Sequence, residues 1–400
     1  MYFITDWIKR IDFDRMREMR LKTLREKMGK NGLDVLINLR PENIRYITGL
    51  HPNWFPYVQF RNLSILTQEG DPLLFIDEGD HLHRKKVMYW LPPQNIIPLP
   101  ILEIPELHRA TLKIIREKLS EMAVSEKRIG VDLLNMDILE GLQQILPEAQ
   151  IIDGDECVKE ARMIKNEEEI KAMRISSICV EMGFHSAIKA IKPGRRECEI
   201  LGEASRTFTS LGMEIAQCQS IVASGEENLS PLARFATDKM IQNGELVFMD
   251  MGGCFNGMFA EATRTVVCGK PHPKQKDIYR IVYEALQEVI SHMKPGKTSE
   301  EAYSAQLKVY QKYNMEKFAH LTLLGHSIGL GGSEPPNFGD PAISGNVFEF
   351  EPGMLFSVEP TLIVPGVPGG GGVRIEDEIL ITETGNEILT KIPYDETLLS

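Results

Sequence analysis

The most informative pattern of apolar and polar positions lies between residues 244 and 269. Residues 246–249 form a continuous apolar run, which predicts a strand that is buried on both faces and ends at Asp250. Three glycines then predict a turn, and the β-branched segment 262–267 predicts a return strand that begins just after Glu261. Paired strands would bring these two carboxylates side by side. The alternative is a hairpin whose two acids are simply solvated.

The first part of the chain alternates between helical and strand patterns. Apolar residues recur near helical spacing between residues 15 and 30, and Gly32 is expected to end that helix. Predicted strands follow at 33–37, 43–49, 63–66 and 72–76, and residues 110–122 are a second predicted helix. These elements predict an α/β domain over residues 1–158.

A second domain, residues 159–400, is expected to begin with a long helix. Asn166 followed by Glu169 is typical of a capping box, and an acidic first turn suits the helix dipole. The helix is predicted to run to about Ile191. Its apolar residues, which are expected to face the core, are Ile170, Met173, Ile178 and Met182.

This second domain contains an internal repeat of about 100 residues. Lys192-Pro193-Gly194 ends the first helix and Lys294-Pro295-Gly296 ends another that starts near Lys274, and an acidic helical stretch follows each of them. The order of helix, Lys-Pro-Gly and helix therefore occurs twice. Two similar halves would face each other across one cleft.

Three later segments place further ligand-type side chains near glycines or at the ends of apolar runs. His326 stands between Gly325 and Gly329, while Glu359 and Glu376 each follow an apolar stretch. With the two acids of the hairpin they make four carboxylates and one imidazole. Adjacent buried carboxylates need protons, cations or metal. Four carboxylates balance the charge of two divalent cations, with a bridging hydroxide as the natural remaining ligand.

At this point the sequence resembles the creatinase, aminopeptidase P and prolidase family of "pita-bread" metallohydrolases over essentially its whole length. The family pattern has two acids eleven positions apart, a His in a Gly-rich motif and two Glu. Five residues of this chain occupy those positions in order: Asp250, Glu261, His326, Glu359 and Glu376. The segment 263–265 and Arg374 also match.

The resemblance implies an N-terminal creatinase-like α/β domain and a C-terminal pita-bread domain with an internal pseudo-twofold repeat. It also implies a dinuclear site in which Asp250 binds one metal, His326 and Glu359 bind the other, and Glu261 with Glu376 bridges them. Glu261 departs from the family, which usually has Asp there, so the metal spacing or occupancy could differ. The oxygen-rich ligand set with one His suggests two divalent ions of Mn, Fe, Co or Zn.

Composition narrows the partners of the chain. A formal charge of -12 argues against nucleic acid or an anionic membrane as a partner, which leaves small molecules or peptides. The N-terminus is too charged for a signal peptide, and the six scattered cysteines suggest reduced thiols, so we expect a cytoplasmic protein. Cys254, between the first two acids, is interpreted as a packing residue.

An aromatic segment at residues 51–57 is costly to expose. It either packs onto its own domain or, as the resemblance implies, reaches the active site of a partner subunit. We therefore predict a homodimer in which Trp54, Tyr57 and Arg61 contact substrate in trans.

Two departures from the family pattern concern catalysis. Peptidase members carry a further His upstream and another seven residues after the ligand His, where this chain has Leu232 and Ser333. Neither side chain titrates near neutrality as an imidazole does. We take Glu359, Arg374 and Ser333 as candidate catalytic residues and Leu232 as a candidate substrate contact.

These observations favour a metal-dependent hydrolase, of the Xaa-Pro dipeptidase or creatinase type, that cleaves an amide or related C–N bond through a metal-bridging hydroxide. The substrate would be a small polar or dipeptide-like molecule. Three alternatives remain open: a lyase acting on a small zwitterion such as dimethylsulfoniopropionate, a creatinase-like or ectoine-hydrolase-like enzyme, and a non-catalytic binding scaffold.

Overall fold

The computed structural model describes residues 10–51, 62–99, 105–122, 127–133, 136–214, 220–226 and 235–400. Contacts between residues divide the chain into two units, of which one comprises residues 12–162 and the other contains residues 163–400. The predicted domain boundary between residues 158 and 159 falls inside helix α6 (Asp155–Met163). Each unit is described by itself.

The unit of residues 12–162 is built on a six-stranded mixed sheet in the order β4-β3-β2-β1-β5-β6. Alternate strand residues feed two separate cores, because Val35, Ile37 and Phe75 pack on one face while Leu74 and Ile76 pack on the other. The strands are β1 (Val35–Asn38), β2 (Leu63–Thr67), β3 (Leu73–Asp77), β4 (Ile96–Leu99), β5 (Arg128–Val131) and β6 (Gln150–Asp153). The other helices are α1 (Phe13–Lys30), α2 (Pro41–Thr48), α3 (Glu78–Val87), α4 (Pro105–Glu121) and α5 (Met136–Ile145).

One predicted strand of this unit is wrong. Residues 43–49 belong to helix α2, which starts with Pro41 at its first position and ends at Gly49, whose φ is 70°. Proline at the first helical position and glycine just past the end are helix signals. Its residues Ile44, Tyr46 and Ile47 are of types that are common in strands, which is why the sequence pattern predicts a strand there.

The unit of residues 163–400 contains three sheets: β7-β8-β9, β11-β10-β12-β15-β16 and the pair β13-β14. Its strands are β7 (Ser220–Ser224), β8 (Leu246–Phe255), β9 (Met258–Val267), β10 (Gly325–Ser327), β11 (Glu334–Phe338), β12 (Leu355–Val358), β13 (Thr361–Ile363), β14 (Gly372–Arg374), β15 (Asp377–Ile381) and β16 (Asn386–Ile388). Its helices are α7 (Glu167–Ala190), α8 (Glu197–Ser210), α9 (Pro273–His292), α10 (Ser299–Lys312), α11 (Pro341–Ser344) and α12 (Glu396–Leu399).

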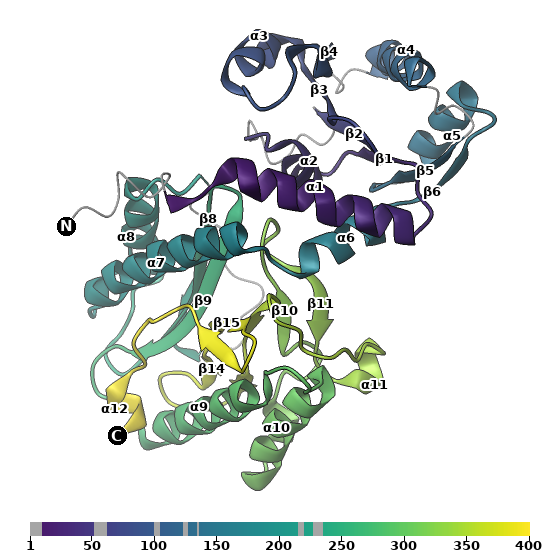
Figure 1. Cartoon of the computed structure of the whole chain (residues 1–400). Coiled ribbons are helices and arrows are strands. Elements are labelled where there is room, and N and C mark those ends of the chain that lie inside the picture. Colours follow the sequence, from purple (N-terminus) through teal and green to yellow (C-terminus); the bar gives the residue numbers. More distant parts are fainter. Residues whose placement is uncertain are drawn as a thin grey trace. The chain divides into compact units, whose positions relative to one another are not determined.

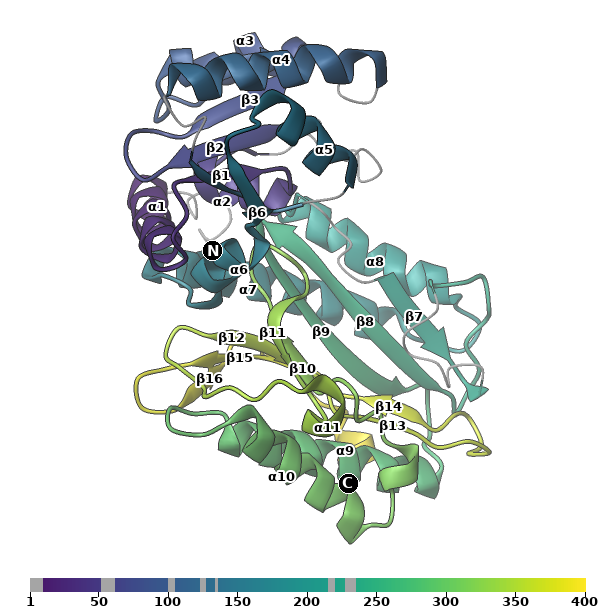
Figure 2. The ribbon, with the colours of Figure 1, turned by 90° about the vertical axis from the view of Figure 1, so that its right-hand side faces the viewer.

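Two matching helix pairs flank these sheets, as the sequence repeat predicts. Helices α7 and α8 lie side by side and pack on β7, β8 and β9, whereas α9 and α10 lie side by side and contact β11, β13 and β14 (Figures 1 and 2). The repeat extends to the backbone before each second helix. Arg195 O accepts from Ile241 N in one half, and Lys297 O accepts from Phe350 N in the other. The two halves therefore share local hydrogen bonding as well as element order.

Strand β8 is longer than the sequence pattern suggested. It continues past Asp250 through Gly252 and Gly253, two of the three predicted turn glycines, to Phe255, and only Asn256 and Gly257 form the turn, with φ of 49° and 86°. An Asn-Gly pair with two positive φ values is the preferred two-residue hairpin turn. Gly252 instead lies opposite Glu261, where a Cβ atom would come within 2.7 Å of the Glu261 Cβ. This glycine is needed so that a long side chain can leave the opposite strand.

Helix α7 begins with the predicted capping box, in which Asn166 and Glu169 bond each other's backbone N–H groups. Met173 is buried as expected, but Ile178 and Met182 are exposed, which corrects their predicted place in the core. The buried stripe instead contains small and polar residues such as Ser176 and Ser177. Close packing of this helix on β9 favours such small side chains.

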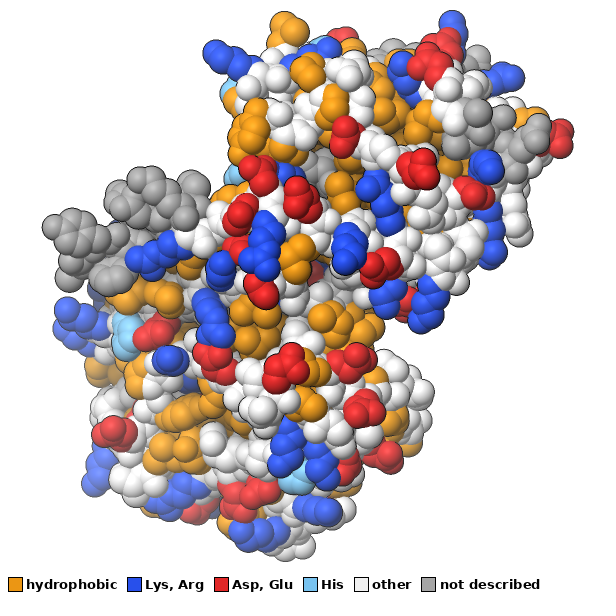
Figure 3. Space-filling model, viewed as in Figure 1, with side chains coloured by type: hydrophobic (Ala, Val, Ile, Leu, Met, Phe, Trp, Pro, Cys, Tyr) orange, Lys and Arg blue, Asp and Glu red, His pale blue; other side chains and the backbone are white. Residues whose placement is uncertain are grey.

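The surface and the cysteines agree with the composition. Acidic and basic side chains are interspersed over the face drawn in Figure 3. The five cysteines within the described ranges are free thiols. Among the helices that the structure describes, none combines the length and apolar character required to cross a bilayer.

Candidate metal centre

Five different backbone segments deliver the predicted ligands of this centre. Asp250 lies on β8 and Glu261 on β9, two positions apart along the paired strands and on the same face of the sheet. His326 lies on β10, Glu359 directly follows β12, and Glu376 lies between β14 and β15, where it forms a β-bridge with Thr263. All five side chains are buried. Residues more than 100 positions apart in sequence thus meet in one buried polar cluster.

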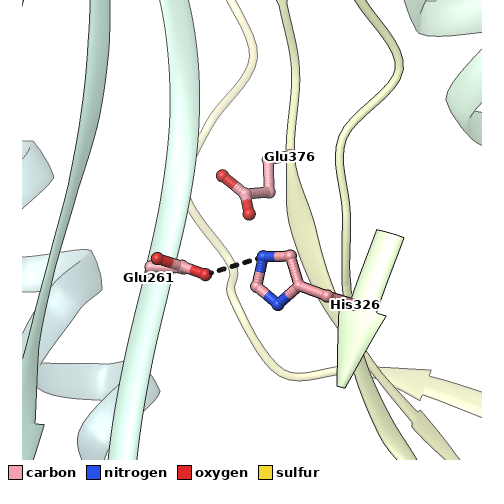
Figure 4. A group of neighbouring side chains, drawn as sticks. All are labelled: Glu261, His326 and Glu376. Carbon is pink, nitrogen blue, oxygen red and sulfur yellow. Dashed lines mark ion pairs between the residues drawn. The ribbon is translucent and has the colours of Figure 1, made fainter. Parts of the chain in front are cut away.

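Three of the five side chains point at one another. Glu261, His326 and Glu376 each offer a ligand atom, and these atoms lie within 4.8 Å of one another. Figure 4 shows the two carboxylates facing the imidazole, with Glu261 Oε1 3.2 Å from His326 Nε2. Three convergent N and O donors of this kind suit a first-row divalent cation.

Arg374 connects the remaining two acids. Its Nη1 atom donates to Asp250 Oδ2 at 3.2 Å and lies 2.9 Å from Glu359 Oε2. Its Nε atom donates to Thr361 Oγ1 at 2.9 Å. Because the guanidinium is 1% exposed, it supplies a fixed positive charge between the two carboxylates.

Other groups orient the ligands. His326 Nδ1 lies 3.1 Å from Ser327 O, and because a carbonyl oxygen only accepts, Nδ1 carries a proton there. Nε2 is therefore the nitrogen that faces the carboxylates: it donates to Glu261 Oε1 when it is protonated and is the nitrogen available to a cation when it is not. Thr263 Oγ1 donates to Glu376 Oε2 at 2.6 Å. Such partners of ligands fix the direction of each donor atom.

The electrostatics show a cluster that is short of positive charge. Burial raises the pKa of Asp250 to about 8, although Arg374 opposes this rise. Burial, followed by the charges of Glu261 and Asp250, holds the pKa of Glu376 well above its ordinary value. For His326, burial lowers the pKa, but the hydrogen bond to Glu261 and the surrounding carboxylates outweigh it and raise the pKa to about 10. Each shift is a way of retaining protons where carboxylates crowd together.

The residues fit a divalent cation. Four carboxylates face one guanidinium and one imidazole, and Asp250 Oδ1 is a buried acceptor without a hydrogen-bond partner among the described residues. A buried carboxylate oxygen in that situation needs a proton or a cation. The donor set is rich in oxygen, and its geometry at Glu261, His326 and Glu376 provides one compact binding point.

Of the other predicted site residues, Ser333 is described by the structure. Ser333 is exposed on the segment between β10 and β11. Trp54, Tyr57, Arg61 and Leu232 lie outside the described residues. Their proposed contacts with substrate therefore stay predictions.

The sequence reasoning missed Glu378, a fully buried acid behind Glu261. Its Oε1 atom accepts a hydrogen bond from Glu261 N at 3.1 Å, and its Oε2 atom bonds the hydroxyl of Ser177 on α7. Burial raises the pKa of Glu378 to about 8. A signal was present, because Glu378 follows Glu376 by two positions in a strand pattern, and such residues share a face.

Comparison with known proteins matches both parts of the chain. Residues 171–383 match the model "Metallopeptidase family M24", and residues 20–164 match "Creatinase/Prolidase N-terminal domain". The chain belongs to metallopeptidase family M24. This membership confirms the family resemblance and the fold class, and it makes the chain a metal-dependent hydrolase with divalent metal cofactors.

Similar proteins cover nearly the whole chain. An uncharacterised peptidase, YqhT, from Bacillus subtilis is 29% identical over 95% of this chain and all of its own length. An Xaa-Pro dipeptidase from Pyrococcus horikoshii is 30% identical over 93% of this chain and 97% of its own length. The crystal structure of a prolidase from Pyrococcus horikoshii OT3 has a TM-score of 0.76 and 27% identity, covering 94% of this chain and 99% of that one.

Proposed function

We propose that this M24 chain is a dinuclear metallohydrolase that cleaves the peptide bond of Xaa-Pro dipeptides or closely similar small amides. The observation that carries the proposal is the convergence of Glu261, His326 and Glu376, together with Asp250 Oδ1, a buried oxygen that has no hydrogen-bond partner among the described residues. The Xaa-Pro dipeptidases among its relatives support the choice of substrate. Two ions of Mn, Fe, Co or Zn fit the oxygen-rich donor set.

Each residue has a task in this proposal. The residues that would hold the ions are Asp250, Glu261, His326, Glu359 and Glu376, and Glu261 and Glu376 would be shared between them. The bound cations would lower the pKa of a water molecule and polarise the scissile carbonyl. Glu359 contacts Arg374 through Oε2, which leaves its Oε1 for the ion, and we assign a role in proton transfer to the same carboxylate. Arg374 keeps Asp250 and Glu359 in place through its shared Nη1.

We extend the proposal to the assembly and its location. Relatives' N-terminal aromatic segments, as the sequence resemblance implies, complete the cleft across subunits, so we propose a cytoplasmic homodimer with Trp54, Tyr57 and Arg61 at the site of the partner subunit. Free thiols at the five described cysteines are consistent with a reducing compartment. Light scattering on the purified protein measures the oligomeric state, and a strictly monomeric active enzyme contradicts the role in trans.

A substrate screen tests the proposed activity. Metal-free protein is reloaded with Mn²⁺, Fe²⁺, Co²⁺ or Zn²⁺, its metal content is measured by elemental analysis, and product release is followed with Xaa-Pro dipeptides, creatine, ectoine and dimethylsulfoniopropionate. We expect more than one equivalent of metal and hydrolysis of Xaa-Pro dipeptides. Protein that takes up metal but only eliminates acrylate from dimethylsulfoniopropionate would establish the lyase alternative. Failure to take up any metal would leave the scaffold alternative.

The variant Ser333→His adds the imidazole that peptidase members carry at this position. Ser333 is exposed and lies outside the ligand cluster, so the variant is expected to retain its metal content. A higher rate on Xaa-Pro dipeptides would show that the native site is adapted to another amide. Efficient cleavage of Xaa-Pro dipeptides by the unmodified protein would show that neither missing imidazole is required.

A further inference from the structure

The outer edge of strand β9 is closed in two different ways. One edge of β9 pairs with β8. Along the opposite edge, every second residue points its backbone N–H and C=O groups away from β8, toward the second half of the unit. At Phe259 the N–H donates to Gly329 O, and at Thr263 the C=O accepts from Glu376 N. Between them, Glu261 N donates to a side chain, the carboxyl of Glu378, at 3.1 Å. The backbone of the candidate ligand is therefore held by an acid rather than by a neighbouring strand.

Glu378 joins three elements at this point. It lies on β15, bonds Glu261 on β9 through Oε1, and bonds Ser177 on α7 through Oε2. The single hydroxyl hydrogen of Ser177 has two acceptors within reach, Glu378 Oε2 and, 2.9 Å away in the same helix, Met173 O. Glu378 is fully buried, so solvent cannot replace either contact.

We propose that Glu378, anchored by Ser177, is a positioning residue that sets the backbone of Glu261 so that its carboxylate meets His326 and Glu376 at the cation. This inference rests on the proposed function, because it assigns Glu261 to metal binding. Glu378 itself does not point its carboxyl at the ligand atoms, since both of its oxygens are used by Glu261 N and Ser177 Oγ. Its effect is transmitted through one backbone N–H.

The side-chain chemistry supplies a conservative and a disruptive replacement. Glutamine reproduces both bonds, because its Oε1 accepts from Glu261 N and its Nε2 donates to Ser177 Oγ, whose own hydrogen then goes to Met173 O. Methionine has a similar length but offers no comparable acceptor, so Glu378→Met leaves the N–H of Glu261 buried without a partner.

Helix α7 supplies a matched control for Ser177. Ser176 precedes Ser177 on the same helix and is equally buried. Its Oγ donates to Met258 O on β9 over 2.9 Å. Met258 is the first residue of β9 and lies three positions before Glu261. Ser176→Ala and Ser177→Ala therefore each remove one buried hydroxyl, but only Ser177→Ala disturbs Glu378.

The experiment measures Mn²⁺ binding to the metal-free full chain by isothermal titration calorimetry, with thermal unfolding recorded for every variant. We expect Glu378→Met to raise the Mn²⁺ dissociation constant about 10–100-fold, as for other residues that orient ligands. Glu378→Gln should bind as the wild type does. Ser177→Ala should bind more weakly than Ser176→Ala at a similar thermal midpoint. The visible spectrum of bound Co²⁺ should change in Glu378→Met and stay unchanged in Glu378→Gln.

Several outcomes would overturn the inference. Wild-type Mn²⁺ affinity in Glu378→Met or in Ser177→Ala would make Glu378 a purely structural residue, as would equal losses in the two serine variants. An equal loss in Glu378→Gln and Glu378→Met would show that the acceptor to Glu261 N is not what matters. If Glu378→Met does not fold, the serine pair and the glutamine variant decide the question. Absence of Mn²⁺ binding in the wild type would overturn the proposed function and this inference together.

Discussion

The unit of residues 163–400 contains two buried charged clusters on opposite sides of the same backbone: the Arg264–Asp377 pair and the candidate metal centre. They differ in how completely their charges are neutralised by protein groups. Arg264 and Asp377 immediately follow Thr263 and Glu376 in sequence, so they point to the opposite side of the same backbone. Arg264 Nη2 lies 2.6 Å from Asp377 Oδ1, and the guanidinium also donates to three backbone carbonyls. Asp377 further accepts from Thr390 and Tyr394. Every oxygen of this acid is satisfied by protein.

The cluster on the other side is equally buried but under-neutralised. Its acids share one arginine and one histidine, and Asp250 Oδ1 has no hydrogen-bond partner in the described part of the chain. A saturated ion pair holds the fold together, whereas unsatisfied convergent oxygens mark a place for a cation. Both clusters are buried, so burial does not tell a structural ion pair from a cation site. The number of hydrogen-bond and ion-pair partners of each carboxylate does.

The largest expected effect follows from removing ligands of the candidate metal centre. His326→Ala removes the only nitrogen donor and Glu376→Ala removes a carboxylate shared by the proposed ions, so both variants should lose metal and activity by several orders of magnitude. Elemental analysis and turnover on the substrate found in the screen measure these losses. Removing Glu376 lessens the crowding of carboxylates, so metal-free Glu376→Ala should be no less stable than the metal-free wild type, whereas His326→Ala removes a positive partner of Glu261 and should be less stable. Near-wild-type turnover in either variant would rule out this centre.

The next largest effect is a loss of stability when the Arg264–Asp377 ion pair is broken. Asp377→Ala leaves the guanidinium of Arg264 buried without its carboxylate, and loss of one partner of a buried ion pair costs about 3–5 kcal/mol. Chemical denaturation should show this loss of unfolding free energy. Asp377→Asn is the matched control, since it keeps an acceptor for Arg264 and should cost less. If Asp377→Ala abolishes metal binding while stability is unchanged, the two clusters do not divide as argued.

Sequence reasoning succeeds for this molecule where a residue's chemistry and its local pattern agree. Asp250 and Glu261 could be placed side by side because apolar and β-branched runs predict paired strands, and the structure shows them two positions apart on one face. The repeated Lys-Pro-Gly segments likewise predict two helix pairs, and Gly194 and Gly296 both have positive φ there. The family motif brought His326, Glu359 and Glu376 to the same place.

The failures arise where tertiary packing overrides a local pattern. In helix α2, Ile44, Tyr46 and Ile47 are of types that are common in strands, and this composition outweighed the helix signals of Pro41 and Gly49 in the prediction. Ile178 and Met182 suggest a core face on α7, but the face that packs on β9 is lined by serines and other small residues because the two elements pack closely. The pairing of Glu378 with the backbone of Glu261 spans 117 positions and has no local signature.

The smallest expected effect is a dependence of the stability of the metal-free protein on pH. In the metal-free protein the pKa of Asp250 is raised by burial from 3.8 to about 8, so between these values the folded state binds more protons than the unfolded state. Stability then falls as pH rises through this window. The raised pKa of His326, about 10, continues the decline above its ordinary value of 6.5. Thermal unfolding of chelator-treated protein between about pH 5 and about pH 8 should show a falling midpoint.

Bound divalent cations would remove this pH dependence, because ligands that hold a metal no longer hold protons. Metal-loaded protein should therefore keep a nearly constant thermal midpoint over the same range. Metal-free Glu376→Gln is the matched control, since removing one crowded carboxylate lessens the need for protons and should flatten the curve. A metal-free wild type whose midpoint rises with pH would show that the carboxylates of this centre are already neutralised by other groups.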